Sequence, residues 1–256
     1  MAERTPEQLA LELINKAIHS KEDELNLRNI KLSHIPPEIT QIPFLRRLDL
    51  ARNRITTLPE YLWQLVNLES LYLDGNQISV IPPEVAKLEK IKTLYLGGNN
   101  IISLSDELGS LNDLEELGIS ISINQFSTLV KIYNRLSKLR ALLLGLAGNE
   151  LTNLPPELWQ LVKIESLSLD RNFLESISPE ISNLINLKKL ALGNNRLETL
   201  PSEIGKLSKL NRLSAYHNQI SFLPKEIGEI INLEFIDLSV NRLTSLPPEI
   251  KTLRNL

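Results

Sequence analysis

An asparagine recurs every 23 residues along most of this chain, inside the frame LxxLxLxxNxLxxLPxxIxxLxN. From Asn99 to Asn149 the spacing lengthens to 25 residues twice, so two successive units each carry two added residues. A unit this short cannot bury its own leucines and is stable only when neighbouring units stack on it. The period therefore predicts a solenoid with a continuous core. The recurring residues are Asn53, Asn76, Asn99, Asn124, Asn149, Asn172, Asn195, Asn218 and Asn241.

Each unit predicts one strand followed by a return segment. The alternation LxxLxL places leucines on one face of a short strand, and prolines after it turn the chain away from the sheet. We expect an α/β horseshoe with a parallel sheet on its concave face and short helical turns on its convex face. No linker interrupts residues 22–256, which predicts one elongated domain. Its ten repeats are 22–44, 45–67, 68–90, 91–113, 114–138, 139–163, 164–186, 187–209, 210–232 and 233–255, and Leu256 opens an eleventh.

The segment 1–21 precedes the repeats and predicts a capping helix. Thr5 and Gln8 have the spacing of a capping box, with Pro6 at the first helical position. Apolar residues then recur at four-residue spacing as far as Ala17, and we expect the helix to end at about His19. This apolar stripe is expected to cover the exposed end of the leucine core.

The fifth repeat departs most from the frame. Residues 126–136 contain no proline and are apolar at helical spacing, which predicts a longer helix on the outer face. The added residues fall in 119–123 and 142–146. Two interpretations remain open: a matched longer strand or bulge without functional meaning, or a feature shaped for a ligand.

Composition narrows the function classes. The formal charge of −3 gives no net attraction to nucleic acid, and no stretch approaches the length of a membrane span. The amino end lacks the layout of a secretory signal, and the absence of cysteine favours a cytoplasmic location. The three histidines are scattered, and no phosphate loop or catalytic constellation occurs. We therefore expect no enzymatic activity, cofactor, metal, nucleic acid or membrane insertion.

The recurring asparagines have a structural explanation. A side-chain amide supplies two donor hydrogens and an acceptor oxygen, which can satisfy backbone groups where each turn leaves the strand. Stacked repeats should bring these amides into a ladder. Binding residues must then be sought among the variable, solvent-directed positions of the sheet face.

Two aromatic surfaces are candidates for a partner. Tyr72 and Tyr95 hold the same frame position in successive repeats and should form one surface, with Asp49 nearby. The alternative is that the tyrosines only stabilise the sheet while the arginines pair with the aspartates. A smooth zone from Gly97 to Gly148 separates this surface from a more basic one, which could attract an acidic or phosphorylated segment or could be an ordinary solvated face. The first surface comprises Arg47, Arg52, Arg54, Tyr72, Asp74 and Tyr95; the second comprises Arg171, Phe173, Lys189, Arg196, Arg212, Tyr216, His217 and Phe235.

The carboxyl end stops as the next strand would begin. An uncapped solenoid exposes apolar core and a strand edge. Three explanations are open: a longer parent chain, pairing with another copy through this edge, or tolerated exposure.

Segments such as LPSEIGKLSKLNRL and LPPELWQLVKIESLSLDRN carry a family resemblance. The chain resembles intracellular leucine-rich repeat proteins with 23-residue units, in particular the Ras-binding scaffolds and the repeat regions of Roco proteins. The resemblance implies a protein-recognition scaffold in intracellular signalling, whose partner could be a small GTPase or another signalling protein. Alternatives are a regulatory fragment of a larger Roco-type GTPase or kinase, and a self-associating assembly element.

Overall fold

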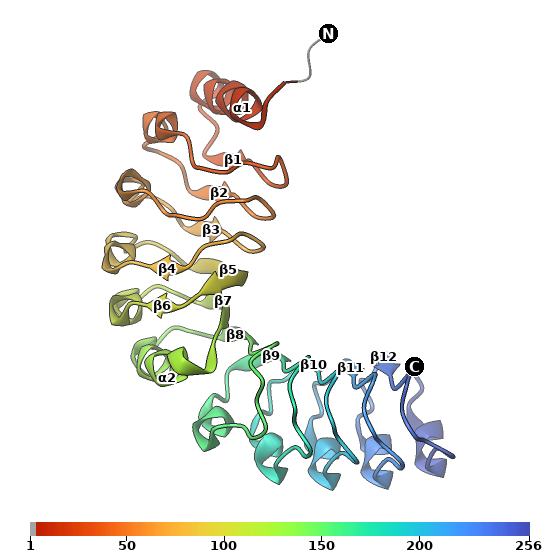
Figure 1. Cartoon of the computed structure of the whole chain (residues 1–256). Coiled ribbons are helices and arrows are strands. Elements are labelled where there is room, and N and C mark those ends of the chain that lie inside the picture. The colour runs from red at the N-terminus through yellow and green to blue at the C-terminus, as the bar shows by residue number, and fades with distance from the viewer. Residues whose placement is uncertain (1–3) are drawn as a thin grey trace. The chain divides into compact units, whose positions relative to one another are not determined.

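The computed structural model describes residues 4–256 and divides into two compact units (Figure 1). The first unit ends at Ala141 and the second comprises Leu142–Leu256. Residues 1–3 of the predicted capping segment 1–21 lie outside the described residues. Each unit is built from repeats that contribute one strand to a parallel sheet.

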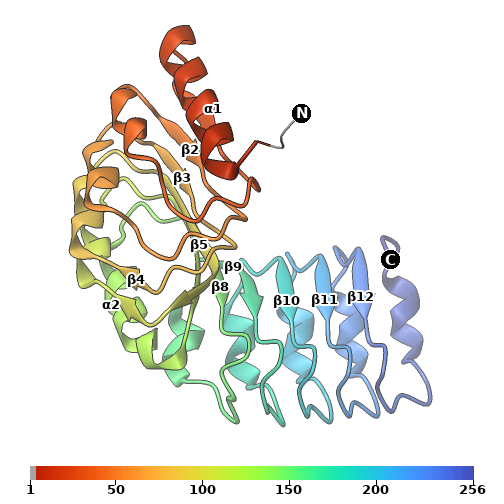
Figure 2. The ribbon, with the colours of Figure 1, turned by 45° about the horizontal axis from the view of Figure 1, so that its top comes forward.

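The first unit begins with the predicted capping helix, α1 (Pro6–Ser20). The side chain of Thr5 accepts a hydrogen bond from the backbone N–H of Gln8, and the Gln8 side chain accepts one from the backbone N–H of Thr5. Ala10, Ile14 and Ala17 are buried. They form the apolar stripe of a helix that packs beside the first strand and the first 3₁₀ turn (Figure 2), as the sequence predicts.

Five parallel strands form the main sheet of the first unit, in chain order. The arginine, serine and threonine that begin β2, β3 and β5 align in register, as do the leucines that follow them. These leucines point into the core, where Leu48, Leu71 and Leu94 are at most 1% exposed. The strands are β1 (Glu24–Asn26), β2 (Arg47–Asp49), β3 (Ser70–Tyr72), β5 (Thr93–Ile101) and β7 (Glu116–Ile121); β4 (Val80–Ile81) and β6 (Ser103–Leu104) form a separate two-stranded sheet.

The second unit repeats this arrangement with five more parallel strands. Leu167, Leu190 and Leu213 occupy the inward position of successive strands and are buried. Between β8 and β9 the register shifts, because Leu142 pairs with Ile164 while Leu143 pairs with Ser166. The strands are β8 (Ala141–Gly145, of which the first residue belongs to the other unit), β9 (Ile164–Ser168), β10 (Lys189–Ala191), β11 (Arg212–Ser214) and β12 (Phe235–Asp237).

The return segments form the predicted helical turns, which are 3₁₀ rather than α-helical. Most begin after a proline with extended φ and ψ, and each ends with a backbone hydrogen bond between residues three apart. They are η1 (Pro37–Gln41), η2 (Glu60–Gln64), η3 (Pro83–Lys87), η4 (Asp106–Ser110), η5 (Ile123–Gln125), η6 (Pro156–Gln160), η7 (Pro179–Asn183), η8 (Ser202–Lys206), η9 (Lys225–Glu229) and η10 (Pro248–Thr252).

The fifth repeat contains the predicted longer helix, α2 (Phe126–Arg135). Phe126, Leu129 and Ile132 are buried along one side of it, and it packs beside η4 of the preceding repeat. The strand β7 in this repeat has six residues, whereas β1, β2 and β3 have three. The strand β5 has nine residues in a repeat of ordinary length, so strand length does not follow the added residues.

Candidate binding surfaces

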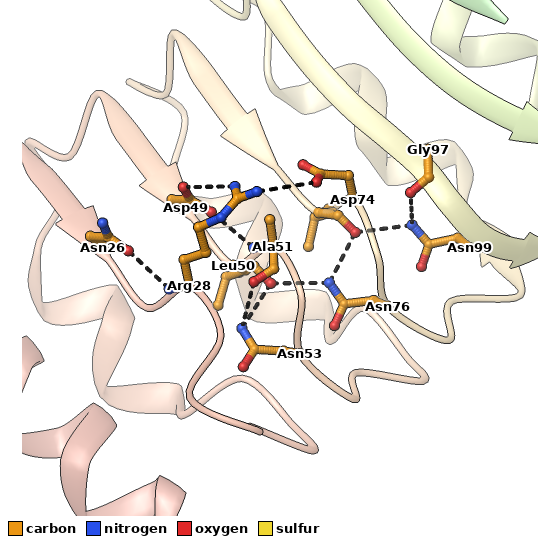
Figure 3. Close-up of polar contacts among 11 residues, drawn as sticks. Asn26, Arg28, Asp49, Leu50, Ala51, Asn53, Asp74, Asn76, Gly97 and Asn99 are labelled. Carbon is orange, nitrogen blue, oxygen red and sulfur yellow. Dashed lines mark hydrogen bonds and ion pairs between the residues drawn. The ribbon is translucent and has the colours of Figure 1, made fainter. Parts of the chain in front are cut away.

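The asparagine side chains connect neighbouring repeats through backbone groups (Figure 3). The Asn76 oxygen accepts the N–H of Ile55 at 3.0 Å, and its amide donates to the carbonyls of Leu50 and Leu73 at 3.0 and 2.9 Å. Because one side chain serves two repeats, it joins them where each strand ends. The same bonding pattern occurs at Asn53, Asn99, Asn172, Asn195, Asn218 and Asn241.

One member of the expected ladder departs from this pattern. Asn149 is not that member, because its amide approaches the Ala147 carbonyl at 3.4 Å, as the amide of Asn53 approaches the Ala51 carbonyl. The prediction for Asn124 is wrong, because the chain folds into η5 there and leaves Asn124 exposed. The next residue, Gln125, accepts the N–H of Leu104 at 3.3 Å. This bond is not equivalent to a ladder bond, because Leu104 lies five residues after Asn99, whereas Ile55 lies two residues after Asn53.

Tyr72 and Tyr95 face each other across β3 and β5, with their rings edge to face and centroids 5.3 Å apart. The guanidinium carbon of Arg47 lies 4.6 Å from the centroid of Tyr72. The Tyr95 hydroxyl donates to Glu116 at 3.0 Å. Arg47, Tyr72 and Tyr95 together define the tyrosine patch, a half-exposed aromatic and cationic surface on the strand face of the first unit.

The expected pairing of arginines with aspartates involves a residue that sequence reasoning missed. Arg28 lies between Asp49 and Asp74 (Figure 3), with nitrogen–oxygen distances of 3.4 and 3.8 Å. Arg28, Ala51 and Asp74 hold one frame position in three successive repeats, so the short Ala51 leaves Asp74 within reach of Arg28. The spacing of these three residues is therefore the feature of the sequence that could have predicted the Arg28 ion pairs.

The other two arginines of the first predicted surface lie on the loops that follow β2. Arg52 has a positive φ of 57°, and Arg54 donates its backbone N–H to Leu32. Both side chains are exposed. The structure places Arg47 over the ring of Tyr72, whereas Arg52 and Arg54 follow the end of the strand β2.

The second predicted surface divides into two groups within the second unit. On the strand face, Arg212 and Phe235 are register partners of β11 and β12, with the guanidinium carbon 4.4 Å from the ring centroid. On the loops beyond the asparagine ladder, Arg196 stacks over Phe173 at 4.6 Å. Lys189 belongs to the strand-face group, whereas Arg171 and His217 lie on loops and adopt positive φ.

One glycine of the predicted smooth zone makes room for a neighbouring ring, whereas a Cβ at Gly148 would meet nothing within 4 Å. A Cβ at Gly118 would lie 3.0 Å from the Tyr95 ring, so Gly118 makes room for the tyrosine patch. The N–H of Gly98 donates to the Ser120 hydroxyl at 3.0 Å. In the second unit, Gly193 admits the ring of Tyr216, which a Cβ there would meet at 2.1 Å.

The pKa shifts of the described residues arise from local burial, hydrogen bonds and ion pairs. Burial raises the pKa of the Asp170 carboxyl, although the Gly193 N–H opposes this at 2.6 Å. A hydrogen bond from Lys92 lowers the pKa of Glu69. Within residues 4–256, no group of three or more His, Cys, Asp or Glu side chains could hold a metal ion, and no helix is long and apolar enough to cross a membrane.

Family models match most of the sequence. A model described as a leucine-rich repeat region matches residues 4–143, and one described as leucine rich repeat matches 162–220 and 185–243. The first match alone covers more than half of the chain. The chain therefore belongs to the leucine-rich repeat family. Comparison with curated proteins finds no match.

Solved structures of leucine-rich repeat proteins are similar to this chain. One, from Leptospira interrogans, is 33% identical with a TM-score of 0.71, over 94% of this chain and 61% of that one. The ectodomain of the plant membrane receptor kinase GASSHO1/SCHENGEN3 from Arabidopsis thaliana, in complex with Casparian strip integrity factor 2, is 32% identical with a TM-score of 0.64, over 87% and 30%. The plant peptide hormone receptor RGFR1, in complex with RGF2, is 30% identical with a TM-score of 0.57, over 87% and 40%. This chain thus spans less than two thirds of each.

Proposed function

We propose that this protein is a recognition module that binds a protein or peptide partner through the tyrosine patch. The observation that carries the proposal is the stack of Arg47, Tyr72 and Tyr95 on the strand face, where no core requires large aromatic side chains. Tyrosine and arginine are enriched among residues that dominate binding energy. The similar receptors GASSHO1/SCHENGEN3 and RGFR1 were solved in complex with their named ligands, which supports a binding role for this fold.

The mechanism is rigid presentation. The tyrosines stand on paired strands, and Gly118 and Glu116 hold Tyr95 in place, so little side-chain freedom is lost on binding. Arg28 pairs with both Asp49 and Asp74 beside the patch, so Arg47 is the cation left to a partner. The partner is therefore expected to supply an apolar or aromatic side chain to the rings, and a carboxylate to Arg47.

The test is affinity capture with the double variant Tyr72→Ala/Tyr95→Ala. Partner binding should fall by roughly 2 kcal/mol or more if these residues form the centre of the interface. Phe222→Ala, which removes an exposed aromatic ring from a loop of the other unit, is the matched control. Undiminished recovery with the double variant, in a protein of unchanged circular dichroism, would refute the proposal.

The identity of the partner is a finer part of the proposal. The resemblance to Ras-binding scaffolds and Roco repeat regions supports an intracellular signalling role, with a small GTPase as the first partner to test. A regulatory role within a larger GTPase or kinase is the alternative. The test is a titration of the protein with a purified Ras-type GTPase in its GDP-bound and GTP-bound states. A regulatory partner should bind with different affinities in the two states, and equal weak binding in both would argue against regulation.

A second candidate function is self-association through the last repeat. Ile236 and Leu238 of this repeat are half-buried, whereas the equivalent Leu213 and Ala215 of the preceding repeat are fully buried. An apolar surface beside the edge strand β12 favours contact with a second copy. Light scattering of the 256-residue chain over a range of concentrations tests this, and a constant monomer mass would eliminate it.

A further inference from the structure

A hollow on the strand face of the second unit differs in chemistry from the tyrosine patch. It has a volume of about 350 Å³ and lies over β9, β10, β11 and β12. Its floor consists of short side chains, and two cations and one aromatic ring rise beside it. We call it the cationic hollow and define it by Ser166, Ser168, Lys189, Arg212, Ser214 and Phe235.

The two cations are direct neighbours. Lys189 and Arg212 are register partners on adjacent parallel strands, whose backbones lie about 4.8 Å apart. Like charges in directly opposed positions destabilise a sheet. The neighbouring Ser166 and Ser214 have short side chains that do not cover the two cations. The positive charges of Lys189 and Arg212 are therefore open to the hollow.

No carboxylate of the described chain compensates this pair. Lys188, next in sequence, pairs with Glu165 at 2.8 Å, and Lys92 pairs with Glu69 at 2.7 Å, but among residues 4–256 neither Lys189 nor Arg212 has an acidic partner within 4.0 Å. Arg212 instead stacks on Phe235. Within the described residues, the two cations of the hollow therefore form no ion pair.

Two acidic side chains on or just after these strands accept hydrogen bonds from local donors. Asp237, on β12, accepts the hydroxyl and the N–H of Ser239 at 2.6 and 3.0 Å. Asp170, after β9, accepts the N–H of Gly193 at 2.6 Å. Both carboxylates thus have local donors, and neither is within ion-pair distance of Lys189 or Arg212.

We propose that the cationic hollow binds a phosphorylated side chain in an extended segment of a partner polypeptide. A phosphomonoester carries close to two negative charges at neutral pH and three acceptor oxygens, which matches two cations flanked by the Ser166 and Ser214 hydroxyls. A single carboxylate would leave one of the two charges uncompensated. The Phe235 ring, 38% exposed, offers an apolar wall for the residue beside the phosphorylated one.

The test is a titration of the full chain with a short glycine-rich peptide that carries one central phosphoserine, followed through backbone amide resonances. Shifts should concentrate on β9, β10 and β11, and binding should be stronger at about pH 7.5 than at about pH 5, because the second phosphate pKa is near 6. Peptides with serine or glutamate at that position should bind roughly tenfold more weakly or worse. Inorganic phosphate should compete at the same resonances.

The variant Lys189→Gln/Arg212→Gln should lose roughly tenfold or more in affinity for the phosphopeptide. Lys189→Gln alone leaves the Arg212–Phe235 stack and should show an intermediate loss. Lys206→Gln/Lys225→Gln removes the same charge from exposed positions of η8 and η9 and should bind as the parent does. Equal losses in this control, equal binding of the glutamate peptide, or no localised shifts would each overturn the proposal.

Discussion

At the scale of single residues, the ladder asparagines concentrate several backbone bonds in one side chain. Asn195 accepts the N–H of Leu174 at 3.0 Å and donates to the carbonyls of Leu169 and Leu192, each at 3.0 Å. It is 8% exposed, so water cannot readily replace these partners. Loss of the amide would leave buried donors and acceptors unsatisfied.

Replacing Asn195 with alanine should therefore lower the free energy of unfolding by roughly 1–3 kcal/mol. The matched control is Asn124→Ala, because Asn124 has the same place in the sequence period but is exposed in η5. That control should change stability by less than about 0.5 kcal/mol. Urea unfolding followed by circular dichroism measures both, and equal effects would contradict the assignment.

Asp170 gives a prediction for pH. Burial raises the pKa of its carboxyl, so the folded protein takes up this proton at a higher pH than the unfolded chain. As pH falls through the folded pKa towards the unfolded value of about 3.9, the folded state gains stability from this group. Relative to Asp170→Asn, the parent should thus become more stable between pH 7 and pH 4.

Comparison of the two proteins isolates this effect from carboxyls that behave oppositely. Hydrogen bonds lower the pKa of Glu69 and Asp237, and the stability that these groups contribute is lost on acidification in both proteins alike. Urea unfolding at a series of pH values provides the difference in free energy. A difference that stays constant, or that moves against the parent as the pH falls, would show that Asp170 is not the cause.

At the scale of elements, the 3₁₀ turns of the second unit pack through glycine. A Cβ at Gly205 in η8 would lie 2.5 Å from the carbonyl oxygen of Glu226, and one at Gly228 in η9 would lie 2.5 Å from that of Glu249. Backbone atoms cannot move aside as a flexible side chain can. The absence of a side chain thus allows successive turns to approach closely.

Gly205→Ala should consequently destabilise the protein by about 1–3 kcal/mol. Gly97→Ala is the matched control, since its new methyl group would meet only the Ser120 hydroxyl oxygen at 3.8 Å. Thermal unfolding of the two variants compares them directly. If Gly205→Ala unfolds no earlier than the control, the turns are able to separate without cost.

The elements also show which parts of the structure sequence reasoning reached. The leucine period, the capping box at Thr5 and the apolar spacing in 126–136 predicted the strands, α1 and α2, because each is a local rule. The failure at Asn124 arose because a period in sequence does not reveal a local fold such as η5. The Arg28 bridge was missed because it depends on side-chain lengths in three successive repeats.

A second asparagine in the frame was likewise overlooked. Asn67 donates to the carbonyl of Pro43 at 2.9 Å, and Asn186 donates to that of Val162 at 2.9 Å. Asn232 and Asn255 repeat this contact at 2.7 and 3.0 Å. These exposed bonds connect the ends of successive repeats, and the closing asparagine of the 23-residue frame was their signal.

At the scale of the whole molecule, each unit contains one tryptophan. Trp63 lies in η2 and is 2% exposed, and Trp159 lies in η6 and is 6% exposed. The variant Trp159→Phe therefore keeps only Trp63, whose fluorescence reports on the first unit. The variant Trp63→Phe keeps only Trp159, which reports on the second unit. Repeat arrays are held by contacts between neighbours, so the least covered end should open first.

We expect the Trp159 signal to have the lower urea midpoint. The first unit is covered by α1, whereas the last repeat of the second unit leaves Ile236, Leu238 and Leu243 only half-buried. Fluorescence of the two single-tryptophan variants measures the two midpoints. Coincident midpoints in both variants would mean that the chain unfolds as one cooperative unit.

The departure at Asn124 has a consequence for how such arrays vary in length. Elsewhere the amide oxygen accepts the N–H two residues after the preceding asparagine, as Asn76 does from Ile55. Beside the lengthened repeat, the corresponding residue is Ile101, which instead pairs with Ile121 in the ladder of β5 and β7. Backbone pairing between strands can therefore replace a side-chain bond, and a repeat protein can change the size of one unit while neighbouring strands such as β3 and β5 stay in register.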